Sequence, residues 1–171
     1  MEKLIDSLIS PIILYGAEIW GIGTQFRNSD PYEKLHTKFI KEILGVHCKA
    51  TNSGCLAELN RIPLYTNIQI SAIKYLLHIV QSNNCLAQKV FQATEATYSW
   101  TTNVKKILNL LGFNFLTFSP LEIKHFLHSI KERIRDVAIQ NQNTDISQNC
   151  KLDFFRKIYK QNQRPPYVDL C

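Results

Sequence analysis

Basic side chains recur at helical spacing in two parts of the chain. Lys34, Lys38 and Lys41 fall on one side of a predicted helix, away from Leu35 and Phe39. Lysines aligned along one face suit contacts with phosphates that do not depend on base sequence. A solvated outer helix face gives the same pattern, so both interpretations stay open. A second group of candidate phosphate contacts follows later in the chain: Lys105, Lys106, Arg133 and Arg135, with Lys124 and Lys131 between them.

Residue patterns that support catalysis are absent from the sequence. Metal-assisted phosphoryl transfer and general acid–base chemistry need acidic side chains held together, yet the six aspartates are widely separated. The six glycines form neither a dinucleotide-binding nor a phosphate-binding loop, and no nucleophile elbow occurs. We therefore predict no catalytic residues, no cofactor and no enzymatic activity for this chain on its own.

Two small groups of side chains carry metal-binding atoms. His47 and Cys48 with Cys55 form one group, and His125 with His128 forms the other. Structural zinc normally requires two short-spaced ligand pairs, and neither group has a second pair. No metal site is therefore predicted, although the sequence leaves open whether His47, Cys48 and Cys55 bind a metal.

Composition and charge narrow the class of protein. The 171 residues are 45% hydrophobic and 20% charged, which is typical of a folded globular chain. Five scattered cysteines indicate free thiols in a reducing compartment, so we expect an intracellular protein of the nucleus or cytoplasm. No apolar run is long enough to cross a membrane, and Asp6 interrupts any signal-peptide core.

The net charge of +6 is concentrated in the later part of the chain. Residues 1–100 contain nine Lys or Arg and eight Asp or Glu, whereas residues 101–171 contain eleven and six. This surplus of positive charge indicates a polyanionic partner such as nucleic acid, although a modest positive charge also serves solubility.

Helix signals recur throughout, and no segment has strand alternation with hairpin turns. We predict an all-α fold of seven or eight helices in a compact domain without a sheet. The polar stretch 139–149 is predicted to be a loop. The predicted core residues share helical spacing and are Leu35, Phe39, Ile43, Leu76, Ile79, Ile107, Leu111, Phe126 and Ile130.

The stretch "SPIILYGAEIWG" reads as a short helix with an unusual residue inside it. Ser10 and Pro11 suit its start and Gly21 its end. Gly16 within a helix costs about 1 kcal/mol relative to alanine. We predict that it removes a side chain so that another element can pack closely, and that Glu18 caps the helix or pairs with a basic side chain.

Three stretches taken in order resemble a known family: "SLISPIILYGAEIWG", "EKLHTKFIKEILGV" and "LAELNRIPLYTNIQISAIKYLLHIV". They resemble the region after the polymerase palm in reverse transcriptases of non-LTR (LINE-type, jockey-like) retrotransposons. The most specific parts are Tyr15–Gly21 and Ile43–Val46, and the weaker likeness continues through "VKKILNLLGF" and "CKLDFFRKIYK". The chain departs from the family at residues 140–142, where the family often has a tryptophan.

The resemblance implies a C-terminal part of an RNA-directed DNA polymerase, without the endonuclease and without the palm that holds the catalytic aspartates. Residues 1–50 would be a thumb-like helical segment and residues 51–171 a helical extension, either as two segments or as one continuous domain. Tyr15, Gly16 and Trp20 would face the palm, and in its absence this surface would favour self-association. The thumb would hold a template–primer duplex by its backbone.

Three functional hypotheses follow. The chain is a non-catalytic polymerase fragment that binds nucleic acid weakly and without sequence preference, a helical protein-interaction domain, or a remnant without function.

Overall fold

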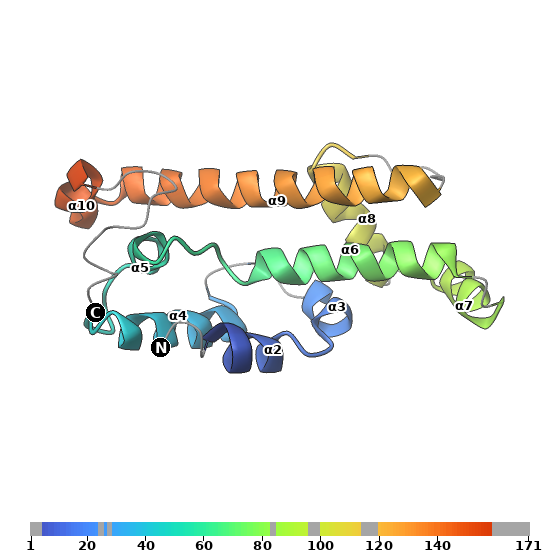
Figure 1. Ribbon diagram of the computed structural model, residues 1–171, viewed down its shortest axis with the longest axis horizontal. Helices are drawn as coiled ribbons and strands as arrows, with labels where there is room; N and C mark the ends of the chain where they lie inside the picture. The colour runs from blue at the N-terminus through green and yellow to red at the C-terminus, as the bar shows by residue number, and fades with distance from the viewer. Residues whose placement is uncertain are drawn as a thin grey trace. The chain divides into compact units, whose positions relative to one another are not determined.

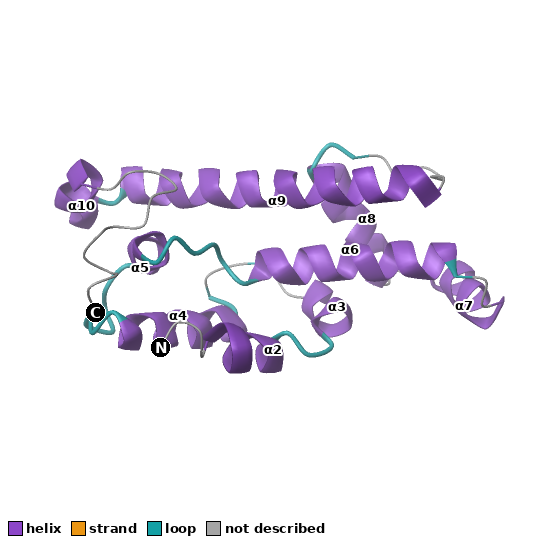
Figure 2. Cartoon of the chain, in the orientation of Figure 1, coloured by secondary structure: helices purple, strands orange, loops and turns teal. Residues whose placement is uncertain are grey.

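The computed structural model describes residues 5–23, 26, 29–82, 85–95, 100–113 and 120–158. Within these ranges the helices are joined by turns and loops and there is no strand, which confirms the all-α prediction (Figure 2). Nine α-helices are present in the described part, and two of them are single turns. In chain order they are α2 (Ser10–Ile13), α3 (Ala17–Trp20), α4 (Pro31–Ile43), α5 (Asn52–Glu58), α6 (Tyr65–Gln81), α7 (Cys85–Glu95), α8 (Trp100–Leu110), α9 (Pro120–Gln148) and α10 (Asp153–Ile158) (Figure 1).

Three shorter helical segments complete the described elements: a π-helical η1 (Ile5–Ile9) and the 3₁₀-helical η2 (Gly21–Gly23) and η3 (Cys150–Leu152). The chain forms two compact units. Unit 1 contains Met1–Ile12, Arg27–Leu64 and Arg135–Cys171, and unit 2 contains Ile13–Phe26 and Tyr65–Ile134. Both units draw on both sides of residue 50, so this division differs from the family-based boundary, which stays a prediction.

The core of unit 2 is built around α6 and α8. Leu76 is fully buried in α6, and Ile107 and Ile130 join the same apolar cluster from α8 and α9, as the periodicity predicts. Leu111, Phe126 and Ile79 are all half-buried. Leu111 and Phe126 pack against this cluster, and Ile79 is not among the residues that do. Aliphatic side chains spaced three and four residues apart therefore identify most of this core correctly.

Gly21 lets η2 approach α6 closely. A Cβ atom built at Gly21 would lie 2.3 Å from Cγ2 of Ile68, so that only glycine fits beside this buried isoleucine. Close packing was predicted at Gly16, and that prediction is wrong. Gly16 interrupts the predicted helix between α2 and α3, with φ 65°, and a Cβ there would meet only the Trp20 side chain at 3.8 Å. Glycine is favoured at Gly16 because the left-handed backbone disfavours a Cβ atom.

Unit 1 has a smaller apolar cluster, formed by Ile5, Ile40, Cys55, Leu56 and Leu59. Phe39 and Ile43 pack against it and are half-buried. Leu35, which was predicted to lie in the core, is 43% exposed. The error arises because α4 turns Tyr32, Glu33, His36, Thr37 and Ile40 inward, so that its buried face is largely polar.

Helix α9 continues through the segment that was predicted to be a loop. Residues 139–148 are helical, and Gln142 and Ile146 are buried in line with Ile134 and Ala138, at four-residue spacing. Most of the other residues of this stretch are polar and exposed. The loop prediction was wrong because one buried residue in four is too sparse a pattern to indicate a helix from hydrophobicity alone.

Candidate nucleic-acid interface

Helix α4 presents two faces of opposite character. Asp30 precedes it in extended conformation, and Pro31 occupies the first turn, where a missing N–H costs nothing. Lys34 and Lys38 are exposed and one turn apart, so they project from the same side of the helix. Leu35 lies beside them, and not opposite them as predicted, which leaves a partly apolar surface next to the two ammonium groups.

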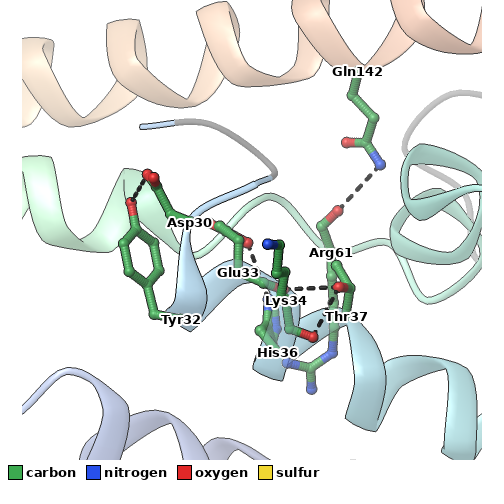
Figure 3. Close-up of polar contacts among 8 residues, drawn as sticks. All are labelled: Asp30, Tyr32, Glu33, Lys34, His36, Thr37, Arg61 and Gln142. Atoms are coloured by element: carbon green, nitrogen blue, oxygen red, sulfur yellow. Dashed lines mark hydrogen bonds and ion pairs between the residues drawn. The ribbon is translucent and has the colours of Figure 1, made fainter. Parts of the chain in front are cut away.

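Polar side chains on the inner face of α4 contact one another and the main chain of the same helix (Figure 3). His36 Nδ1 lies 3.7 Å from Glu33 Oε2, and both side chains are almost completely buried. The Thr37 hydroxyl donates to the main-chain oxygen of Glu33 at 2.8 Å. Both contacts join residues of α4 itself, so the buried polar groups on this face have polar neighbours within the helix.

An ion pair joins η1 to the chain that follows α5. Both terminal nitrogens of Arg61 donate to the carboxylate of Asp6 at 2.8 Å, in a bidentate arrangement. The hydrogen-bonded guanidinium lowers the pKa of Asp6 below its ordinary value and outweighs partial desolvation, which acts in the other direction.

Gln142 links α9 to the α5 region of the same unit. Its side-chain nitrogen donates to the main-chain oxygens of Ser53 at 3.2 Å and of Arg61 at 3.3 Å, and Figure 3 shows the amide directed toward Arg61. Its burial shows that Gln142 has a specific structural role at this position.

Lys41 differs from the other two lysines of the predicted face. It is half-buried, and its ammonium group donates to the main-chain oxygen of Cys48 at 2.9 Å. It therefore holds the turn that follows α4, where Gly45 has φ 62°. The structure keeps Lys34 and Lys38 together on the outer face and assigns Lys41 a contact with the turn.

The second group of predicted cations is divided between the two units. Lys106 is exposed on α8, and Lys105 is half-buried with its Nζ 6.0 Å from the centre of the Phe91 ring. Arg133 and Arg135 are exposed on α9, but two residues in a helix are separated by about 200°, so they project from nearly opposite sides. Arg133 belongs to unit 2 and Arg135 to unit 1, and the two side chains do not form one patch.

The three residues predicted to face a palm domain form an exposed turn in unit 2. Tyr15 is 87% exposed and Trp20 is 45% exposed, and the indole nitrogen of Trp20 donates to the main-chain oxygen of Tyr15 at 2.9 Å. This hydrogen bond closes the turn around Gly16. Glu18 contributes through its main-chain oxygen, which accepts a hydrogen bond from the indole nitrogen of Trp100 at 2.6 Å.

The side chains considered as metal ligands do not converge. Nδ1 of His47 accepts a hydrogen bond from the Lys49 N–H at 3.1 Å, and the Cys48 sulfur lies 3.8 Å from the same nitrogen. Cys55 is buried, and its burial raises the pKa of the thiol. No group of three or more His, Cys, Asp or Glu side chains suited to a metal ion occurs among the described residues.

Four buried or paired polar residues of unit 1 were not predicted from the sequence, namely Glu33, His36, Arg61 and Gln142. Only the three-residue spacing of Glu33 and His36 is visible in the sequence. The other contacts join residues 55 to 89 positions apart, for which a single sequence carries no local signal.

Comparison with protein-family models, with curated proteins and with solved structures gave no match. Within the described ranges, no single helix is long and apolar enough to cross a membrane. The segments Ile5–Ile13 and Ala17–Gly23, which are bent relative to each other, together have the length and composition of a membrane span. Buried core helices also meet these two criteria.

Proposed function

We propose that this chain corresponds to the thumb and the following helical region of a non-LTR retrotransposon reverse transcriptase, and that it binds nucleic acid weakly through the phosphate backbone. The family assignment is supported by the ordered likeness of the three sequence stretches described above. The binding proposal rests on one observation: Lys34 and Lys38 are both exposed and lie one turn apart on the same side of α4. The proposed activity includes no catalysis by this chain alone.

The arrangement of α4 suits backbone binding for two reasons. Lysine is a flexible point charge that attracts phosphate without reading bases, so the binding would not depend on sequence. The side chains of Glu33, His36 and Thr37 on the other side of the helix are buried, so the two lysines already point outward in the folded unit.

The test is the salt dependence of binding to a labelled RNA–DNA duplex. Each phosphate contact contributes about 0.9 to the slope of log affinity against log salt for duplex DNA. Three lysines acting together predict a slope of roughly −3, but the Cys48 contact of Lys41 leads us to expect roughly −1.8 from Lys34 and Lys38. The variant Lys34→Gln/Lys38→Gln should lose this part of the slope.

Two controls accompany this measurement. Lys74→Gln removes an exposed lysine from α6 and should change the slope by less than either α4 substitution. Circular dichroism should be unchanged in both variants because the substituted side chains are exposed. Equal slopes for the native chain and the double variant would refute the lysine pair as the binding site, and primer extension by the purified chain would refute the absence of catalysis.

A second candidate function is supported by the exposed turn at Tyr15, Ile19 and Trp20. Three large side chains, each at least 45% exposed, form a surface typical of a protein contact, and the stretch 11–23 contains no lysine or arginine. We propose that this turn contacts a palm domain supplied in the larger protein, or a second copy when the palm is absent. Tyr15→Ser should abolish any concentration-dependent self-association and leave nucleic-acid binding unchanged.

A further inference from the structure

Helix α7 in unit 2 leaves one apolar edge uncovered. Leu86 is 71% exposed and Val90, one turn later, is 55% exposed, whereas Phe91 packs against the core of the unit. None of the described side chains of this helix is buried. Because residues 86 and 90 lie on a different side of the helix from residue 91, the core covers only part of its apolar surface.

The charged residues of this part of the sequence are mostly lysines, and one of them, Lys89, lies at the edge itself. Residues 85–110, which include α7 and α8, contain Lys89, Lys105 and Lys106 but only one acidic residue, Glu95. Lys89 is exposed beside Leu86 and Val90 on α7. On α8, Leu110 is 87% exposed and lies one turn after Lys106. The Lys105–Phe91 contact at 6.0 Å places the two helices side by side.

We propose that the edge of α7 formed by Leu86, Lys89 and Val90 binds an acidic amphipathic helix of another protein. Leucines of such a helix would cover Leu86 and Val90, and flanking carboxylates would lie near Lys89. This inference is independent of the nucleic-acid proposal, because it concerns different residues and a different kind of partner.

Charge and chemistry distinguish this partner from three others. A second copy packed on this edge would bring Lys89 of one chain close to Lys89 of the other, which is unfavourable. Nucleic acid gains nothing from covering leucine and valine, because its backbone is charged and these side chains cannot stack on bases. Leu86 and Val90 together carry fewer aliphatic carbons than a myristoyl chain, which alone gives only marginal membrane binding.

The test uses the full chain and two synthetic helical peptides. One peptide has leucine at positions i, i+3, i+4 and i+7 with glutamate on either side, and the other has lysine in place of each glutamate. Fluorescence anisotropy should show that the glutamate peptide binds about tenfold more tightly or better. Leu86→Ser/Val90→Ser should weaken that binding by about tenfold or more, and Lys89→Glu should reverse the preference between the peptides.

Leu35→Ser is the matched control, because Leu35 is a partly exposed leucine on α4 in the other unit and its substitution should leave peptide affinity unchanged. Equal affinity for the two peptides, or full binding by the Leu86/Val90 variant, would overturn the proposal. So would a dimer, or binding to phosphatidylserine vesicles, that is lost in that variant, since either result would assign the edge to a different partner.

Discussion

The interior of unit 2 is aliphatic, whereas the interior of unit 1 includes charged and amide side chains. Unit 2 buries a continuous cluster that includes Ile73, Leu76 and Leu108, and the buried polar side chains among its described residues are two threonines. Unit 1 buries Glu33, His36 and Gln142 beside a smaller apolar cluster. Apolar packing is non-directional and tolerates small displacements, but each buried polar group requires a partner at a defined distance.

This difference predicts that the two units respond differently to substitution. In unit 2 the loss of stability should increase with the volume of side chain that is removed or added. In unit 1 the loss should follow the hydrogen bonds and ion pairs that are broken.

The largest effect is expected from Leu76→Ala in unit 2. Leu76 is completely buried, so its truncation removes apolar contacts and leaves a cavity that costs about 2–5 kcal/mol. Urea denaturation followed by circular dichroism measures this change. Leu35→Ala, at a partly exposed leucine, should alter stability by less than about 0.5 kcal/mol. Equal losses for the two variants would contradict the assignment of the core.

Gly21→Ala tests the close packing of η2 on α6. The added methyl group would lie 2.3 Å from Ile68 Cγ2, and isoleucine has few alternative rotamers in a helix. We expect a loss of about 1–3 kcal/mol from overpacking, measured by thermal or urea unfolding. Gly23→Ala has no atom within 4 Å of the new methyl group and should be nearly neutral. A stable Gly21 variant would show that the two segments can separate at little cost.

Gln142→Ala tests the polar interior of unit 1. The substitution leaves the main-chain oxygens of Ser53 and Arg61 without this donor, which should cost about 1–2 kcal/mol. Hydrogen exchange of α5 should accelerate in the variant, because Ser53 belongs to that helix. Gln140→Ala, on an exposed position of the same helix, is the control. If both variants behaved alike, the amide contacts would carry no stability.

The smallest effect is expected from the Asp6–Arg61 pair. Because the pKa of Asp6 is lowered in the folded chain, the pair contributes stability while the carboxyl group is ionised. That contribution is present at neutral pH and is lost as the pH falls through the folded-state pKa. Because the Asp6 side chain is 63% exposed, the ion pair should contribute no more than about 1 kcal/mol to stability.

The contribution is measured by urea unfolding at neutral pH and at about pH 3, which lie above and below the ordinary pKa of aspartate. Asp6→Asn should reduce the loss of stability on acidification, whereas Asp145→Asn, at an exposed acid of α9, should not. An identical pH dependence in the native chain and the Asp6 variant would argue against the ion pair.

Sequence periodicity was a good guide where burial is apolar and a poor guide where it is polar. It identified Leu76, Ile107 and Ile130 as core residues, and all three are buried. It failed for Leu35 and for residues 139–148, because in α4 and in the second part of α9 polar side chains occupy inward positions. For the candidate site, helical spacing predicted that Lys34 and Lys38 share a face, but it could not show that Lys41 contacts Cys48.

The sequence by itself determined the all-α class and the common direction of Lys34 and Lys38, because helix spacing and helix-terminal residues are local properties of the chain. Only the tertiary structure decided which side of α4 faces inward, that Gly21 and not Gly16 permits close packing, and that Leu86 and Val90 stay exposed. The packing at Gly21 depends on Ile68, and the burial of Gln142 depends on Ser53, and each of these neighbours comes from a distant segment. Burial is therefore decided by which distant groups are brought together, and this information is not contained in the local pattern.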